Sequence, residues 1–229
     1  MLRQLFELYD FQFDDETISK YERFLELFKE KNSQINLSSL RDNHSIIEKH
    51  FIDSLMLTKF FNLEGKVADI GTGGGFPLLP LAILNNDAYF TGIDSVGKKL
   101  KAINEFVINL GLENVQTIHS RFEDIGNDKK YRESFDYVVS RATAYFPTLL
   151  EYAIPLLKVG GIFIAYKLDN IDEVNEGKKA LEELNCKIID TKKYSLGGQD
   201  RMLVFVKKEG NTDKKYPRNA GLPLKKPII

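Results

Sequence analysis

The chain has 229 residues, of which 43% are hydrophobic and 28% charged, with a formal net charge of −1 at pH 7. This size fits one globular domain with a real core, and the near-zero charge gives no overall attraction to nucleic acid. The single cysteine, Cys186, excludes a disulfide framework and fits a reducing cytoplasm, and no apolar run is long enough to cross a bilayer. We therefore expect a cytoplasmic protein without a membrane segment.

The first 64 residues are predicted to form helices. In residues 17–31, Ile18, Tyr21, Leu25 and Phe28 recur at helical spacing, with charged residues between them. Residues 44–57 repeat the pattern, and Asp42 or Asn43 precedes them as a possible cap. We interpret residues 1–64 as a helical cap on a larger domain.

From residue 66 the pattern alternates between strands and helices. The candidate strands are rich in β-branched and aromatic residues and cover residues 66–70, 88–94, 115–120, 135–142, 161–167, 186–196 and 201–208. The last two flank the turn sequence GGQD, which indicates an antiparallel hairpin. The predicted fold is α/β, with a mostly parallel seven-stranded sheet whose last strand is antiparallel.

A glycine-rich turn follows the first strand, in the sequence VADIGTGGGF of residues 67–76. In a doubly wound sheet this turn is part of the ligand site. The dinucleotide fingerprint fails because Phe76 stands where its third glycine would be, and the Lys-Ser/Thr pair of a P-loop is absent. The remaining pattern, D-x-G-x-G-x-G, is that of S-adenosylmethionine-dependent methyltransferases of the Rossmann-like class. Asp69 would attract the amine of the cofactor, while N–H groups of the turn that contains Gly71 and Gly73 would bind its carboxylate. A structural turn without a ligand is the alternative.

Two further positions fit the same cofactor. Asp94 ends the second strand, where such sheets place an acid for the ribose hydroxyls, although a plain helix-capping role is also possible. Phe122 and Glu123 follow the third strand, where an adenine would be stacked and its amino group bound. A buried phenylalanine and a surface glutamate are the alternative for this pair.

The residue types narrow the methyl acceptor. The Asn/Asp-Pro-Pro-aromatic motif of adenine amino methyltransferases is absent, and Cys186 lies outside any strand end where a nucleophile would act. The three histidines and one cysteine lack metal-ligand spacing, so we expect no metal. These absences leave methyl acceptors that need no deprotonation. Guanine N7 is one of them, because methyl transfer to its free lone pair requires positioning of the base and no catalytic base. A halide, a phenol or a small amine is also compatible with these residues.

The chain closely resembles the bacterial RsmG (GidB) family. The resemblance runs from about residue 36 to 228 and rests on NLSSLRDNHSIIEKHFIDSL, DIGTGGGFPLLPLAI, DSVGKKLKAI, SRFEDI, VVSRA and YPRNAGLPLKKPI. It implies S-adenosylmethionine-dependent methylation of N7 of one guanosine in 16S rRNA, producing 7-methylguanosine, within the small ribosomal subunit or an assembly intermediate. Leu78, where the family has glycine, and Phe122, where a small residue is common, depart from the pattern. The alternative is a methyltransferase for a small molecule or a protein.

The resemblance also implies roles for individual residues. It makes Gly71, Phe76, Phe122, Glu123 and Arg141 cofactor contacts, and it places Asn36 and His50 near the acceptor pocket. Arg141, directly after the fourth strand, would meet the cofactor carboxylate or an RNA phosphate, or form a structural salt bridge. A core histidine remains an alternative for His50.

Basic residues are the candidates for binding RNA. Lys98 and Lys99 open the helix after Asp94, where they oppose the helix dipole, so their placement suggests a ligand charge. Arg121, Lys167 and Arg218 would extend a phosphate track. We divide the chain into the cap (1–64), a cofactor-binding domain (65–208) and a basic tail (209–229).

Overall fold

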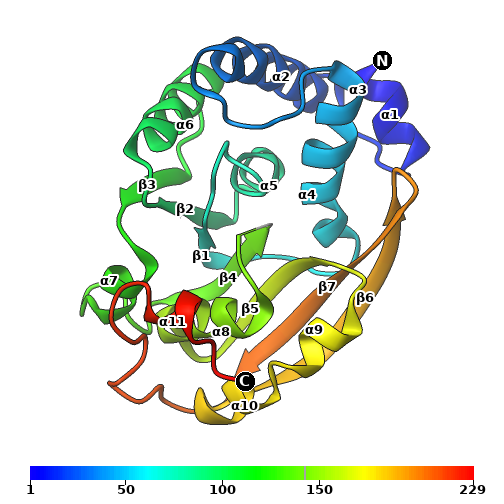
Figure 1. The fold of residues 1–229 in the computed structure, drawn as a ribbon. Helices are drawn as coiled ribbons and strands as arrows, with labels where there is room; N and C mark the ends of the chain where they lie inside the picture. Colours follow the sequence, from blue (N-terminus) through cyan, green and yellow to red (C-terminus); the bar gives the residue numbers. More distant parts are fainter. Residues whose placement is uncertain (142) are drawn as a thin grey trace.

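The computed structural model describes residues 1–141 and 143–229, and in this part of the chain a seven-stranded sheet carries helices on both faces (Figure 1). The strand order is β3-β2-β1-β4-β5-β7-β6. The pairs among β1 to β5 are parallel, while β7 is antiparallel to both β5 and β6. The predicted α/β class with a mostly parallel sheet and an antiparallel last strand is confirmed.

The strands lie close to their predicted positions. Their bounds are β1 Gly65–Ile70, β2 Ala88–Asp94, β3 Val115–His119, β4 Phe135–Arg141, β5 Leu157–Leu168, β6 Cys186–Leu196 and β7 Gln199–Lys208. The prediction carried the fourth strand to Ala142, which is outside the described residues. The predicted hairpin is present: Gly197 and Gly198 both have positive φ, 55° and 73°, as a two-residue turn between twisted strands requires.

The N-terminal helices form as their sequence indicates. These are α1 (Leu2–Leu8) and α2 (Asp15–Ile35), followed by a continuous helical segment made of α3 (Asn43–Ile46), a π-helical turn (Ile47–Ile52), α4 (Asp53–Leu55) and a 3-10 turn (Met56–Lys59). Asp14 caps α2 by accepting a hydrogen bond from the Thr17 N–H at 2.8 Å. Asp42, rather than Asn43, caps α3 through the Ser45 N–H, also at 2.8 Å.

The π-helical turn is the main local departure from the sequence prediction, which had one regular helix over residues 44–57. The N–H of Asp53 bonds to the carbonyl of Glu48, five residues earlier. Side chains bond to carbonyls within the turn: the Lys49 carbonyl accepts from Arg141 Nη1 at 2.8 Å, and the His50 carbonyl from Ser54 Oγ at 2.6 Å. The first of these donors comes from a strand 92 residues away, so local periodicity could not reveal it.

Two hydrophobic clusters cover the two faces of the sheet. One contains the N-terminal helices, α5 (Leu78–Leu84) and α6 (Gly97–Leu110); the other contains α7 (Phe122–Asn127), α8 (Phe146–Ala153), a 3-10 turn (Ile154–Leu156), α9 (Ile171–Asn175) and α10 (Lys178–Glu183). Consecutive residues of β1 point into different clusters, Val67 into the first and Ala68 into the second. The helices of residues 1–64 therefore share one core with the sheet.

The C-terminal segment packs on the second face and ends in α11 (Leu222–Lys225) (Figure 1). Arg132 fixes its start by donating to the carbonyls of Thr212 (2.9 Å), Asp213 (3.1 Å) and Tyr216 (2.7 Å). Tyr216 and Ile228 are buried in the second cluster. No helix of the described residues is both long and apolar enough to cross a membrane.

Candidate active site

A cavity of about 370 Å³ lies at the carboxyl ends of β1, β2 and β4. The strand order reverses between β1 and β4, and this switch point is where open α/β sheets bind their ligands. The lining extends from Leu37 in the cap to Thr143 just beyond β4. The predicted site residues among its lining are His50, Gly71, Gly73, Phe76, Asp94, Lys99, Phe122 and Arg141.

The glycine turn forms the floor of this cavity. Gly71 has φ of 76°, and its N–H donates to the Ile93 carbonyl at 2.8 Å. A Cβ at this position would lie 2.5 and 2.6 Å from two atoms of the Thr143 side chain. The turn therefore needs glycine at residue 71 both for its backbone conformation and for its contact with the segment after β4.

Asp94 ties the glycine turn to the end of β2. Its buried carboxylate accepts from the Gly73 N–H at 3.0 Å through Oδ2 and from the Val96 N–H at 2.8 Å through Oδ1. Asp94 thus lies at the strand end where the sequence predicted it, within the lining of the cavity. A carboxylate fixed by two backbone donors is preorganised to accept hydrogen bonds from vicinal hydroxyls.

Several buried polar atoms around the turn have no hydrogen-bond partner among the described residues. They are both carboxylate oxygens of Asp69, the hydroxyl of Thr72 and Nε of Arg141. Burial raises the pKa of Asp69 to about 7, and the nearby Thr72 side chain and the Arg141 charge oppose this without reversing it. Buried polar groups are normally paired, so this cluster is suited to a polar or zwitterionic ligand.

Arg141 is held by a buried ionic network. Its Nη1 donates to Asp53 Oδ2 at 3.0 Å, and the fully buried Asp53 also accepts from Arg201 Nη1 at 3.2 Å and from the Tyr194 hydroxyl at 2.8 Å. A carboxylate with three donors compensates the cost of its burial. The sequence left a structural salt bridge open as one role for Arg141, and the structure contains this salt bridge.

The same guanidinium also contacts His50, which lines the cavity. Arg141 Nη2 lies 3.1 Å from His50 Nδ1, and His50 Nε2 lies 2.7 Å from Ser38 Oγ. Burial, followed by the charge of Arg141, lowers the pKa of His50 to about 3, so the imidazole is neutral. Asn36 is exposed at the end of α2, and its Oδ1 accepts from Arg41 Nη2 at 2.8 Å; it is not part of the cavity lining.

Phe76 joins the cap to the glycine turn. Its ring stacks on His50 with centroids 4.6 Å apart and also packs against Phe24 (5.3 Å), Phe28 (5.1 Å) and Phe51 (5.5 Å). The side chain is 5% exposed, so most of its surface supports the core. Phe76 thus positions His50 and also borders the cavity.

A second cavity of about 610 Å³ adjoins the first and shares Ser95, Phe122 and Thr143 with it. Glu123 lines it and is itself buried, accepting from the Gly221 N–H at 2.7 Å and the Tyr152 hydroxyl at 3.3 Å. The C-terminal segment therefore forms one wall of this space through Gly221. The structure places Phe122 half-buried beside the Tyr152 ring, with centroids 5.1 Å apart.

The predicted RNA-binding residues fall into two groups. Lys98 and Arg121 are exposed, and Lys99 lines the first cavity. Lys167 instead pairs with Glu173 at 2.5 Å and donates to the Ala144 carbonyl at 3.1 Å.

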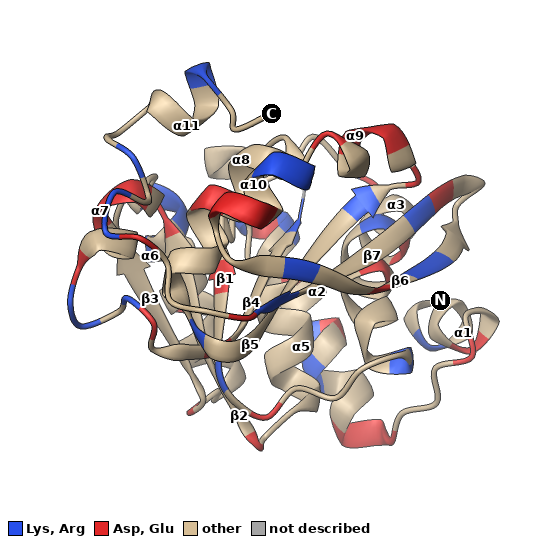
Figure 2. Ribbon diagram, turned by 90° about the horizontal axis from the view of Figure 1, so that it is seen from below, with Lys and Arg blue, Asp and Glu red and all other residues tan. Residues whose placement is uncertain are grey.

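Arg218, the remaining member, forms a two-pronged pair with the fully buried Glu151, at 2.9 Å through Nε and 2.6 Å through Nη2. Figure 2 shows Lys and Arg interspersed with Asp and Glu on the side of the molecule that it presents, without one continuous basic face there.

Sequence reasoning missed Ser38, Asp53 and Thr143. Asp53 interrupts an apolar helical face three residues after His50, and an acid in such a position signals a buried partner. Ser38 and Thr143 carry no local signal, because only the folded chain brings them to the cavity.

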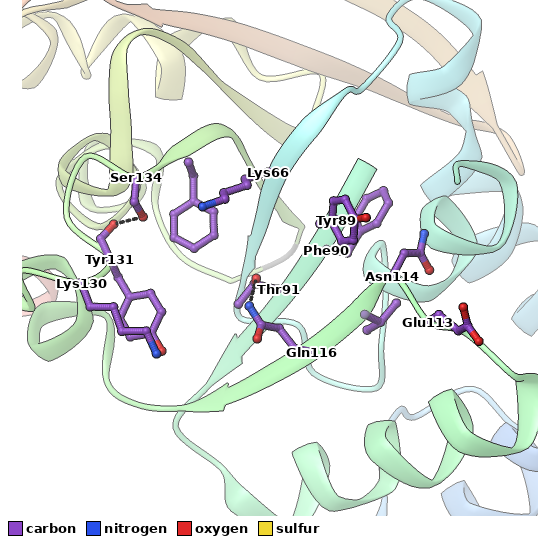
Figure 3. A pocket seen from close by; sticks show the side chains of 12 residues that line it. Lys66, Tyr89, Phe90, Thr91, Glu113, Asn114, Gln116, Lys130, Tyr131 and Ser134 are labelled. Carbon is purple, nitrogen blue, oxygen red and sulfur yellow. Dashed lines mark hydrogen bonds between the residues drawn. The ribbon is translucent and has the colours of Figure 1, made fainter. Parts of the chain in front are cut away.

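A cavity of about 440 Å³ lies at the opposite, amino end of the sheet (Figure 3). Its lining includes Lys66, Tyr89 and Lys130. Gln116 donates to Thr91 Oγ1 at 3.0 Å, and Ser134 to the Tyr131 carbonyl at 2.6 Å, so polar side chains of this wall satisfy local partners. Among residues 1–141 and 143–229, no group of three or more His, Cys, Asp or Glu side chains is arranged to hold a metal ion.

Solved structures support the fold. A SAM-dependent methyltransferase from Aquifex aeolicus matches with a TM-score of 0.54 at 20% identity, covering 78% of this chain and 97% of that one. The YcgJ protein from Bacillus subtilis matches with a TM-score of 0.53 at 13% identity, covering 71% of this chain and 100% of that one.

Sequence relatives are much closer. Ribosomal RNA small subunit methyltransferase G of Desulfitobacterium hafniense is 44% identical over 216 residues, which are 93% of this chain and 90% of the relative. The protein of the same name from Clostridium novyi is 39% identical over 225 residues, 96% of this chain and 93% of the relative. The model of the family described as rRNA small subunit methyltransferase G (GidB) matches residues 17–204. This chain belongs to the rRNA small subunit methyltransferase G family.

Proposed function

We propose that this protein transfers a methyl group from S-adenosylmethionine to N7 of one guanosine in the 16S rRNA of the small ribosomal subunit. The observation that carries the proposal is the cavity at the strand switch point, lined by the glycine turn, Thr72 and Arg141. Polar atoms of both Thr72 and Arg141, and of the fully buried Asp69 outside the lining, have no partner among the described residues. Family membership favours ribosomal RNA as the substrate class. Such a substrate implies a cytoplasmic enzyme.

The residues present fit the cofactor. An amino-acid moiety carries an ammonium and a carboxylate, which would satisfy the Asp69 carboxylate and the donors around the turn, Arg141 Nε among them. Asp94 would hold the ribose hydroxyls, and Phe122 and Glu123 would border the adenine in the second cavity. Gly71 and Gly73 allow close approach of the ligand to the backbone.

The reaction needs positioning rather than proton transfer. Bound S-adenosylmethionine would supply a methyl group on a sulfonium, and the N7 lone pair of guanine is free to attack it. The protein would hold the base in line and keep water out. His50 is not arranged as a base, because its Nδ1 already receives a hydrogen bond from Arg141 and burial lowers its pKa to about 3.

A covalent intermediate is also disfavoured. Cys186 begins β6, the edge strand of the sheet, whereas the cavity lies at β1, β2 and β4. Burial raises the pKa of this thiol to about 12, so it is protonated near neutral pH. We infer direct transfer without a metal or a covalent adduct.

Cations at or next to the cavities would bind the RNA backbone. We assign this role to the exposed Lys98 and Arg121 and to the half-buried Lys99. Arg121 lines the second cavity and Lys99 the first, and Lys98 is the neighbour of Lys99 at the start of α6. Lys167 and Arg218 are engaged in internal ion pairs, and we assign them a structural role. We retain the division into cap (1–64), cofactor domain (65–208) and tail (209–229), with the cap and the tail each supplying one wall of the site.

The test is a methyl-transfer assay. Purified protein and labelled S-adenosylmethionine are incubated with small subunits, with naked 16S rRNA and with assembly intermediates, all lacking N7-methylguanosine. Nucleoside mass spectrometry then identifies the product. We expect labelled 7-methylguanosine in 16S rRNA.

Variants sharpen the result. Asp94→Ala removes the carboxylate at the cofactor cavity and should abolish both transfer and S-adenosylhomocysteine binding. Asp87→Ala, an exposed aspartate just before the amino end of β2, is the matched control and should leave both unchanged. Label on a small molecule or a protein, with none on RNA, would contradict the proposed substrate and favour the alternative class of methyltransferase.

A further inference from the structure

The hydrogen-bond chain from Arg141 through His50 to Ser38 has a direction that the atoms themselves fix. A guanidinium has only donors and does not lose its proton in proteins. Because Arg141 Nη2 lies 3.1 Å from His50 Nδ1, Nδ1 must be the acceptor and carries no proton. The Lys49 carbonyl also lies 3.2 Å from Nδ1, but it already accepts from Arg141 Nη1 at 2.8 Å. A proton on Nδ1 would lie against the Arg141 guanidinium, whose nitrogens can only donate, so the arginine decides in favour of an unprotonated Nδ1.

A neutral imidazole whose Nδ1 accepts must hold its proton on Nε2. The ring is enclosed by Phe76, stacked at 4.6 Å, and by the edge of Phe28 at 5.8 Å, which disfavours a second proton. His50 Nε2 therefore donates to Ser38 Oγ, at 2.7 Å. The arginine thus fixes the tautomer of His50.

Ser38 Oγ receives a second donor as well. The Leu40 N–H lies 3.1 Å from it, so two donors occupy its two acceptor positions. Among the described residues no acceptor takes the Ser38 hydroxyl proton, while Ser38 lines the cavity of about 370 Å³. The hydroxyl is therefore left as a hydrogen-bond donor at that cavity.

The loop that carries Ser38 is itself fixed. The side chain of Asn32, 2% exposed, accepts from the Ser38 N–H at 2.8 Å and donates to the Leu40 carbonyl at 2.9 Å. The buried Asn32 amide thus fixes the backbone of both Ser38 and Leu40, and Leu40 supplies one of the two donors to the Ser38 hydroxyl. A donor held in this way is preorganised, as specific recognition requires.

The chemistry of the acceptor base gives this donor a purpose. The edge of guanine that contains N7 also presents O6, and both atoms are acceptors. A methyltransferase acting on N7 must leave the N7 lone pair free. On this edge it can therefore hydrogen-bond only to O6, and the protein group must be a donor. Adenine presents an amino group at the same place, which would face the Ser38 proton unfavourably.

Resting on the N7-guanine function proposed above, we propose that the Ser38 hydroxyl donates a hydrogen bond to O6 of the acceptor guanine and selects guanine over adenine. Arg141 and His50 are positioning residues in this scheme: they fix the hydroxyl as a donor without touching O6. Asp53 in turn fixes the guanidinium, at 3.0 Å.

A chemical double-mutant cycle tests the contact. Small subunits are reconstituted with 16S rRNA that carries either guanine or 2-aminopurine, which lacks O6, at the methylated position, and kcat/KM is measured for wild type and Ser38→Ala. We expect each single change to reduce kcat/KM by about 3- to 10-fold, the range for one neutral hydrogen bond. The two changes together should cost no more than one alone, because either removes the same bond.

Three controls separate this contact from general damage. S-adenosylhomocysteine affinity of Ser38→Ala should equal that of wild type, whereas its Tm should fall modestly because His50 Nε2–H and the Leu40 N–H lose their acceptor. Ser39→Ala, the exposed neighbour, should behave as wild type, and Ser38→Thr should restore discrimination. For the relay, His50→Gln can accept and donate as histidine does and should keep the preference for guanine over 2-aminopurine, whereas His50→Leu should lose it.

The outcomes are distinct from those of the main proposal. Multiplicative losses in the cycle would overturn the Ser38–O6 contact even when the wild type makes 7-methylguanosine. A loss of S-adenosylhomocysteine affinity in Ser38→Ala would overturn it too, since the serine would then serve the cofactor. Failure of the wild type on guanine substrates would instead refute the proposed function.

Discussion

Replacing Asp69 by asparagine should change how the stability of the protein depends on pH. Asp69 lies fully buried near the end of β1, and burial raises its pKa from the usual 3.8 to about 7. The folded state therefore holds the proton more tightly than the unfolded chain. The stabilisation linked to this proton is complete below about pH 4 and is lost as the pH rises through 7.

From the difference between these two pKa values, ionisation of Asp69 lowers the unfolding free energy of the wild type by about 4 kcal/mol in total once the pH exceeds both. About 3 kcal/mol of this loss occurs between pH 5 and 8.5. An asparagine side chain cannot ionise, so the unfolding free energy of Asp69→Asn relative to wild type should rise by up to about this amount across that range. The new amide also needs partners, which adds a pH-independent cost of about 1–3 kcal/mol. The slope of the difference against pH, and not its sign at one pH, is therefore the decisive quantity.

Urea unfolding of both proteins at pH 5, 6, 7, 8 and 8.5 measures this slope, with Asp87→Asn as an exposed control. A ΔΔG that stays constant from pH 5 to 8.5 would refute the reasoning, because it would mean that the folded state leaves Asp69 ionised as in the unfolded chain. Saturating S-adenosylhomocysteine should flatten the slope in wild type if its ammonium approaches the carboxylate.

Three further outcomes follow from the geometry. Gly71→Ala would place a Cβ 2.5 Å from the Thr143 side chain at a φ of 76°, so S-adenosylhomocysteine affinity in calorimetry should fall at least 10-fold; unchanged affinity would contradict the fixed turn. Glu151→Ala would leave Arg218 without its buried partner and should lower the unfolding free energy by about 3–5 kcal/mol in urea titrations, whereas a loss below 1 kcal/mol would argue against that role. Lys98→Gln should raise KM for small subunits and reduce the salt dependence of binding by about one phosphate contact, with cofactor affinity as the unchanged reference.

The positions and order of the strands are encoded in local sequence patterns. Strands such as Ala88–Asp94 and Cys186–Leu196 lie at their predicted residues, because β-branched and aromatic runs bounded by turns leave little choice. Alternation of strands and helices dictated a parallel sheet, and with it the place of the ligand at the carboxyl ends of the strands. Gly71 and Asp94 could be predicted because each lies directly after or at the end of a strand.

Which polar residues contact one another depends on the packing of distant parts of the chain. Arg141 lies on β4, Asp53 and His50 lie in the N-terminal segment, and Tyr194 and Arg201 lie on the hairpin; no local pattern relates them. The π-helical turn around His50 depends partly on a donor from β4, and the proton positions follow from the arginine. Hydrogen-bond direction is a property of packed neighbours, so it becomes defined only when the cap, the sheet and the hairpin have come together.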